Sequence, residues 1–176
     1  GIDTVDNDYS LRATPAYVSL SERNRSMGVG AKNQATTNMK NTVSSFKRLI
    51  GRRFKDPQVQ NEINNYPKPF KIIEGPAGET LIQVQYMEEV QTFTPEQISA
   101  MLLTKLKETA ENAMNTKVVD VVISVPSYFT DIERRSMLAV CQMAGLNCVK
   151  IMNDTTAVSL AYGIYKQDLP EEKEKP

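Results

Sequence analysis

The central stretch of the sequence begins with Val118-Val119-Asp120-Val121-Val122-Ile123-Ser124-Val125, which Pro126 follows directly. β-Branched residues fill most of this run, and such a run predicts a strand buried on both faces of a sheet. Proline cannot donate a hydrogen bond to a neighbouring strand, so Pro126 predicts the end of this one.

A helix is expected next, because Thr130-Asp131-Ile132-Glu133 has the spacing of a capping box. Its apolar stripe comprises Met137, Val140, Cys141 and Ala144. Gly145 is expected to end the helix in the left-handed conformation. A second strand is predicted over residues 148–152 and a second helix over residues 153–164. Strand, helix, strand and helix with short loops predict a parallel sheet with a right-handed crossover.

Two residues lie where such a sheet binds ligands, at the carboxyl ends of its strands. These are Pro126 and Asp154. The competing interpretation is that Pro126 only stops a strand and Asp154 only caps a helix. Taken one at a time, the two residues favour that structural interpretation.

The composition limits the classes of function. The 176 residues carry 21 basic and 21 acidic side chains and no histidine, so neither nucleic-acid binding nor a membrane surface is indicated. Zinc sites and histidine-based triads are excluded, and no apolar run is long enough to span a bilayer. Cys141 and Cys148 are expected to be buried thiols in a reducing compartment, with a disulfide between them as the open alternative.

The first half of the chain is expected to be polar and rich in strands, predicted over residues 14–20, 70–74, 81–86 and 91–93. The turn-forming Gly75-Pro76-Ala77-Gly78 predicts a hairpin. Ile2 and Val5 are edge-strand candidates, and a short helix is predicted over residues 58–63.

Two longer helices are also predicted. The first covers residues 41–51, where a final glycine ends it and Val43, Phe46 and Ile50 share a face. The second begins at Thr94, continues to about residue 115, and has Pro95 in its first turn. A basic cluster follows the first of these helices and is expected to be a solvated surface; it comprises Arg48, Arg52, Arg53 and Lys55.

Several motifs, in register along the chain, resemble the seventy-kilodalton heat-shock proteins. They include Thr14-Pro15-Ala16-Tyr17-Val18, Phe46-Lys47-Arg48-Leu49-Ile50-Gly51-Arg52, Val125-Pro126-Ser127-Tyr128-Phe129 and Ala144-Gly145-Leu146-Asn147. Asn153-Asp154-Thr155-Thr156-Ala157 resembles the N-E-T-T-A of the large, hundred-and-ten-kilodalton branch, whereas the smaller chaperones have N-E-P-T-A.

The resemblance implies an α/β fold of the actin-like ATPase (ribonuclease H-like) type, whose nucleotide lies in a cleft between two lobes. The chain is similar to most of lobe I. Residues 1–14 would be a remnant of the inner subdomain, 15–93 the outer inserted subdomain, 94–166 the inner subdomain and 167–176 a charged tail. Because the sequence starts at Gly1 and contains neither phosphate loop of the family, both ends are expected to be cut from a longer chain.

The resemblance also implies roles for six residues. Lys47 and Asp154 are the catalytic candidates: the lysine near the γ-phosphate, and an aspartate where the family has a glutamate that holds metal-bound water. Pro126 and Arg134 would relay the nucleotide state. Lys150 and Asp131 would contact a co-chaperone or linker, with lysine replacing a family arginine at position 150. The implied cofactor is ATP or ADP with magnesium, and none of these residues is expected to bind the metal directly.

The function implied is that of the ATP-binding part of a chaperone that serves as nucleotide exchange factor and holdase. Its partners would be heat-shock 70-type chaperones and, through domains outside this chain, unfolded polypeptides, in the cytoplasm with the nucleus left open. The chain alone is expected neither to turn over ATP nor to be more than marginally stable. The alternative is a stand-alone protein-interaction module that has lost nucleotide chemistry.

Overall fold

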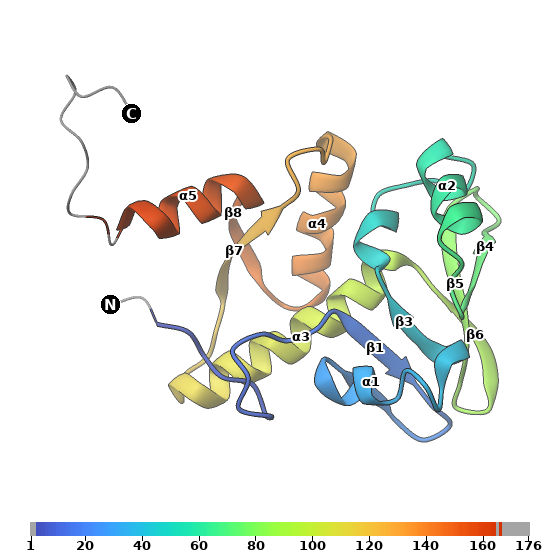
Figure 1. The fold of residues 1–176 in the computed structure, drawn as a ribbon, viewed down its shortest axis with the longest axis horizontal. Coiled ribbons are helices and arrows are strands. Elements are labelled where there is room, and N and C mark those ends of the chain that lie inside the picture. The colour runs from blue at the N-terminus through green and yellow to red at the C-terminus, as the bar shows by residue number, and fades with distance from the viewer. Residues whose placement is uncertain (1–2, 165, 167–176) are drawn as a thin grey trace.

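The computed structural model describes residues 3–164 and 166, in which three sheets and their covering helices form the fold (Figure 1). The strands are β1 (Tyr17–Leu20), β2 (Arg25–Met27), β3 (Thr42–Ser44), β4 (Lys71–Glu74), β5 (Thr80–Tyr86), β6 (Glu89–Phe93), β7 (Asp120–Val125) and β8 (Asn147–Asn153). The α-helices are α1 (Val29–Asn33), α2 (Pro57–Asn65), α3 (Pro95–Met114), α4 (Asp131–Met143) and α5 (Asp154–Ile164), and η1 (Met39–Asn41) and η2 (Phe46–Leu49) are 3₁₀ turns.

The first half of the chain forms two antiparallel sheets, ordered β2-β1-β3 and β4-β5-β6. Val18 of β1 faces Val43 of β3, and both side chains are fully buried. The predicted hairpin and third strand are confirmed by the pairing of β4 with β5 and of β5 with β6. Edge-strand formation at Val5 is wrong, since Val5 lies in irregular chain, and Ile2 lies outside the described residues.

The helix predicted over residues 41–51 is wrong. Thr42 and Val43 instead extend along β1, and Ser45 takes the left-handed conformation with φ of 56°. The chain then makes the short turn η2, which carries Lys47. Local apolar spacing suggested a helix, but strand pairing with a distant segment outweighs it, as is common for β-branched residues.

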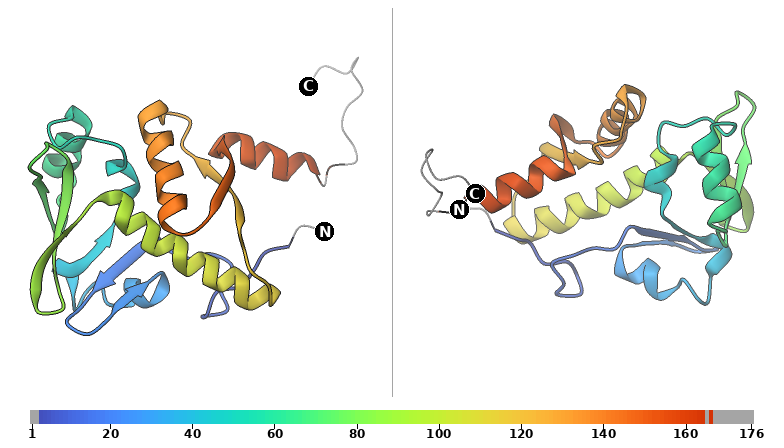
Figure 2. Two further views of the ribbon diagram at one scale, coloured as in Figure 1. Left: turned by 180° about the vertical axis from the view of Figure 1, so that it is seen from behind. Right: turned by 45° about the horizontal axis from the view of Figure 1, so that its top comes forward.

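Helix α3 joins the two halves of the fold (Figures 1 and 2). Its predicted start is confirmed: Thr94 and Gln97 form a reciprocal capping box, with Pro95 in the first turn. Ile98 packs into a core under the antiparallel sheets, and Ala100 packs into a second core against α4 and β7. Residues of one helix therefore belong to both cores.

The parallel pair is confirmed, since β7 and β8 run side by side with Val125 opposite Asn153. The expectation that this strand is buried on both faces is wrong. Only Val125 of β7 is fully buried, while Val122 is 51% exposed and the preceding Val119 is 60% exposed. Within the described residues β7 and β8 pair only with each other. One face of the pair packs on α4, while Val122 and Val149 leave apolar surface open to solvent.

Two further expectations can be compared with the structure. Both cysteines are free, with Cys141 buried and Cys148 only half-buried, so the expectation of two buried thiols holds for Cys141 alone. Burial, with the neighbouring Cys148 adding to it, raises the pKa of Cys141 to about 11.

The subdomain boundaries near residues 14, 93 and 166 stay predictions, and the predicted tail at 167–176 lies outside the described residues.

Candidate functional site

Lys47 and Asp154 lie together, although 107 positions separate them in the chain. Lys47 Nζ is 3.4 Å from Asp154 Oδ2, and the two side chains are 49% and 43% exposed. Lys47 comes from η2, beside the antiparallel sheets, and Asp154 is the first residue of α5, directly after β8. The pair thus bridges the two halves of the fold at the carboxyl edge of the parallel strands, where α/β proteins bind ligands.

Pro126 is buried and ends β7 as predicted. It opens a tight turn in which the Phe129 amide donates to the Pro126 carbonyl at 3.0 Å. Phe129 is 5% exposed and packs into the second core. The backbone that follows β7 is therefore held firmly at the same edge of the sheet as Asp154.

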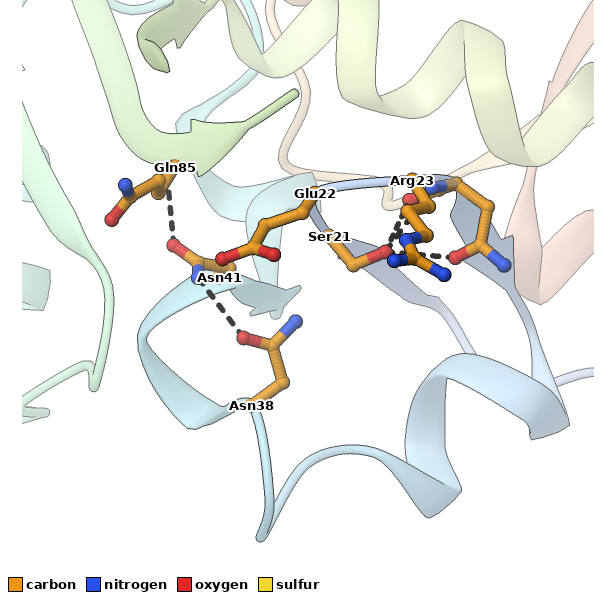
Figure 3. A pocket seen from close by; sticks show the side chains of 7 residues that line it. Ser21, Glu22, Arg23, Asn38, Asn41 and Gln85 are labelled. Atoms are coloured by element: carbon orange, nitrogen blue, oxygen red, sulfur yellow. Dashed lines mark hydrogen bonds between the residues drawn. The ribbon is translucent and has the colours of Figure 1, made fainter. Parts of the chain in front are cut away.

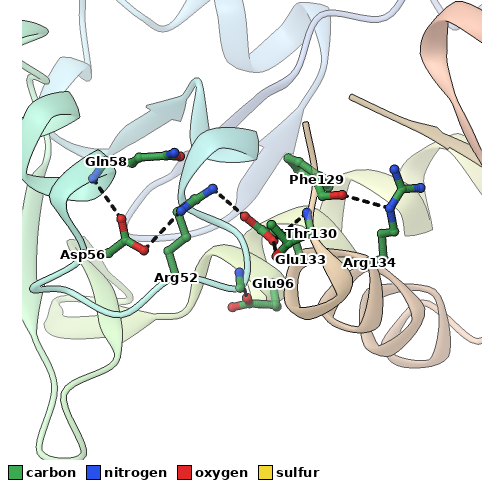
Figure 4. Close-up of polar contacts among 9 residues, drawn as sticks. Arg52, Asp56, Gln58, Glu96, Phe129, Thr130, Glu133 and Arg134 are labelled. Atoms are coloured by element: carbon green, nitrogen blue, oxygen red, sulfur yellow. Dashed lines mark hydrogen bonds and ion pairs between the residues drawn. The ribbon is translucent and has the colours of Figure 1, made fainter. Parts of the chain in front are cut away.

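Arg134 connects this turn to the residue before α5, and Figure 4 shows its contact with Phe129. Its Nε donates to the Phe129 carbonyl at 2.9 Å, and one terminal nitrogen donates to Asn153 Oδ1 at 2.7 Å. Asn153 precedes Asp154 in the chain. The structure therefore brings Pro126, Arg134 and the Lys47–Asp154 pair into one connected region, while their roles in nucleotide sensing stay predictions.

Lys150 and Asp131 lie apart from that region. Asp131 begins α4 and pairs with Arg135 at 2.8 Å on an exposed surface. Lys150 is exposed on β8. Among the described contacts, neither side chain touches the other or the Lys47–Asp154 pair, and their role in binding a co-chaperone or linker stays a prediction.

Sequence reasoning missed a buried ion-pair network around Arg52. Arg52 Nη2 lies 2.5 Å from Glu133 Oε1, and Nη1 lies 3.1 Å from Asp56 Oδ2; the side chains of Arg52 and Glu133 are only 12% and 3% exposed. Glu133 also accepts from the Thr130 amide at 3.0 Å, which confirms the capping box (Figure 4). For Arg52 the expected solvated surface is therefore wrong. The signal in the sequence was the capping-box glutamate, a fixed acidic group able to bind a cation.

Burial by itself raises the pKa of Glu133, but hydrogen bonds from Thr130 and the charge of Arg52 outweigh it, so the pKa lies below its ordinary value. Glu62 shows the same balance, since burial opposes the hydrogen bonds from Arg48 and Lys68, and its pKa is also lowered. Arg48 and Lys68 lie 2.6 Å and 3.2 Å from Glu62. Both carboxylates are therefore ionised and held by cations at neutral pH.

A wide depression of about 510 Å³ lies on the antiparallel sheets (Figure 3). It is lined by Ser21, Glu22, Arg23, Asn24, Asn38, Asn41 and Gln85. Its amides bind one another: Asn41 donates to Asn38 Oδ1 at 2.9 Å and accepts from the Gln85 amide at 2.8 Å. None of the residues predicted to be functional lines it.

The described part of the chain contains no group of three or more histidine, cysteine, aspartate or glutamate side chains placed to hold a metal ion. Its helices include none with both the length and the apolar character needed to cross a membrane.

Comparison with known proteins agrees with the motifs. A family profile described as "Hsp70 protein" matches residues 1–175. The chain is 57% identical over all 176 residues to the "97 kDa heat shock protein" of Strongylocentrotus purpuratus, covering 20% of that protein. It is 57% and 56% identical to "Heat shock 70 kDa protein 4" of Rattus norvegicus and of Homo sapiens, in each case covering 21% of the relative.

The chain thus spans about a fifth of the length of these relatives. The parallel β7–β8 unit with its helices, combined with the antiparallel sheets, agrees with lobe I of the actin-like ATPase fold. On the match over nearly every residue, the chain belongs to the Hsp70 family of heat-shock proteins, within its large, hundred-and-ten-kilodalton branch.

Proposed function

We propose that this chain is part of the ATP-binding domain of a heat-shock chaperone and that Lys47 and Asp154 face the nucleotide phosphates. The observation that supports this most is the Lys47–Asp154 pair, whose side chains meet at 3.4 Å across the two halves of the fold and remain half exposed. An exposed charge pair contributes little stability of its own, so its place in the fold is more informative than its energy. This one lies at the ligand-binding edge of a parallel sheet.

The two side chains fit a hydrated magnesium nucleotide. The Lys47 ammonium has three donors and a full positive charge, which suits phosphate oxygens and offsets charge on the transferred phosphoryl group. The Asp154 carboxylate can only accept when ionised, which suits waters bound to a metal. Magnesium, when bound, would neutralise phosphate charge. Aspartate is one methylene shorter than the glutamate of the family, so we expect weaker support of those waters and slow hydrolysis.

The relay proposed for Pro126 and Arg134 is supported by their contacts. Arg134 binds both the turn that Pro126 opens and the residue before Asp154. A shift of Asp154 on nucleotide binding or release would therefore pull on the Pro126 turn. Lys150 and Asp131 are exposed, which suits the proposed contact with a co-chaperone or linker.

The role of the whole protein is a further part of the proposal. Within a longer chain, this segment would be part of a protein with two roles. It would be a nucleotide exchange factor for heat-shock 70-type chaperones and a holdase for unfolded polypeptides. We place it in the cytoplasm, with the nucleus left open. Family membership and the large-branch relatives support this role.

A stand-alone interaction module is the second candidate, and one observation favours it. Apolar side chains that are more than half exposed lie on β7, on the residue before it, on β8 and on α5: Val119, Val122, Val149, Val158, Leu160, Tyr162 and Ile164. Such a surface is typical of contact with further protein. That protein would be more of the same chain in the first proposal and a separate partner in the second.

A chimera separates the two candidates. This chain would replace the matched segment of the rat "Heat shock 70 kDa protein 4", and Mg-ATP binding would be measured calorimetrically beside the unaltered rat protein. We expect the dissociation constants to agree within about threefold, a difference of less than 1 kcal/mol. A folded chimera that binds no ATP, beside a rat protein that does, would favour the interaction module.

A further inference from the structure

We propose that Arg52 and Glu133 are a positioning pair that holds Lys47 against Asp154. The inference rests on the proposed function, in which Lys47 and Asp154 face the phosphates, and it assigns the geometry of that site to two residues outside it. It concerns a contact between the antiparallel half of the fold and α4, in full view in Figure 4.

The Arg52–Glu133 ion pair is buried, and each side chain has few other partners. Arg52 and Glu133 are 12% and 3% exposed and meet at 2.5 Å. Asp56 binds the other terminal nitrogen of Arg52 at 3.1 Å, and Thr130 donates to Glu133. A buried charge that loses its partner is costly, so each of the two holds the other in place.

On one side, the pair fixes the segment that carries Lys47. Arg52 follows Lys47 by only five positions in the chain. Between them, Ile50 packs into the second core, and the Gly51 amide donates to Glu96 Oε1 of α3 at 2.7 Å. The segment from η2 to Arg52 is thus fastened to the α/β half of the fold immediately after Lys47.

On the other side, the pair fixes the segment that carries Asp154. Glu133 is followed by Arg134, which binds Asn153 Oδ1 at 2.7 Å. Asn153 leads directly into Asp154. Three side-chain contacts, Arg52–Glu133, Arg134–Asn153 and Lys47–Asp154, are joined by short backbone segments into a closed ring.

If this ring holds the site together, breaking the Arg52–Glu133 pair should let Lys47 and Asp154 move apart. The partly exposed Lys47–Asp154 salt bridge contributes little to the stability of the fold by itself. It persists because both partners are delivered to the same place by buried contacts. Arg52 and Glu133 are accordingly positioning residues, and neither is proposed to touch the nucleotide.

Zero-length cross-linking measures this positioning without any nucleotide. A water-soluble carbodiimide activates a carboxylate, and a lysine amine in contact with it displaces the urea to form an amide. The Lys47–Asp154 amide in the 176-residue chain would be quantified by peptide mass spectrometry. The Lys105–Asp8 amide, from a pair at 2.5 Å on α3 and the N-terminal segment, is the internal reference.

In Arg52→Gln and in Glu133→Gln we expect the Lys47–Asp154 yield to fall by about tenfold relative to the reference, because intramolecular reaction requires the two groups to be held in contact. Arg53→Gln is the matched control: Arg53 is the next residue, and its guanidinium donates to the Ala77 carbonyl at the surface. Its yield should equal that of the unaltered chain.

An unchanged Lys47–Asp154 yield in folded Arg52→Gln would overturn the proposal. Circular dichroism checks folding. Should Arg52→Gln fail to fold, Glu133→Gln carries the test by the same criterion, since it keeps the side-chain volume and an acceptor for Thr130. Because no nucleotide is used, a failed cross-linking test leaves the proposed ATP site standing, and a failed ATP-binding test leaves the positioning result standing.

Discussion

An Ile98→Ala chain is expected to unfold with a free energy about 3–4 kcal/mol below that of the unaltered chain. Ile98 has no exposed surface and packs in the core under the antiparallel sheets. Truncation removes buried methyl groups and leaves a cavity that the surrounding strands cannot close. Because Ala100 of the same helix packs in the second core, the loss should be felt in both halves of the fold.

Urea unfolding at equilibrium measures this effect as a lower midpoint with an unchanged slope. Val158→Ala is the matched control, since Val158 also lies on a helix but is 69% exposed. It should change the unfolding free energy by less than about 0.5 kcal/mol. A loss below about 1 kcal/mol for Ile98→Ala would contradict the account of α3 as the shared element of two cores.

Gly51→Ala is expected to destabilise the chain by about 2–4 kcal/mol. Gly51 has φ of 71°, a conformation that costs residues with a Cβ atom, and an added Cβ would lie 2.9 Å from the Glu133 Cα and 3.1 Å from its backbone nitrogen. These are backbone atoms of α4 and cannot turn aside as a side-chain tip can. The loop after η2 would have to move away from α4.

The same equilibrium unfolding experiment tests this prediction. Gly163→Ala is the control, because an added Cβ there has no atom within 4 Å and Gly163 lies in α5. Alanine favours helix over glycine, so that variant should be unchanged or more stable by up to about 1 kcal/mol. Equal stability of Gly51→Ala and the unaltered chain would show that the close approach is not needed.

Local signals in the sequence were enough to predict much of the second half of the chain. The start of α3 at Thr94 and of α4 at Thr130 follow from capping boxes, which depend on neighbours three residues apart. The parallel pairing of β7 and β8 follows from the order of elements. For Lys47 and Asp154, family motifs suggested a shared site, and the structure brings the two side chains together.

The errors arose where a distant segment determines the local structure. The apolar residues around 42–44 have the spacing of a helix, but residues 42–44 pair with β1, more than 20 residues earlier in the chain. Arg52 belongs to a basic run, yet it is buried because it forms an ion pair with Glu133, which lies far along the sequence. Val122 has the composition of a core strand but is half exposed, because the described elements do not cover that side of β7.

The most direct test of the central claim, that Lys47 faces the outermost phosphate, compares ATP with ADP. In the chimera described above, we would measure the dissociation constants of both nucleotides before and after Lys47→Ala. The account predicts that ATP binding weakens by about tenfold, near 1.4 kcal/mol, while ADP binding changes by less than about twofold, because ADP lacks the group that Lys47 would contact. Equal affinity for ATP with and without Lys47, or an equal loss for ATP and ADP, would contradict it.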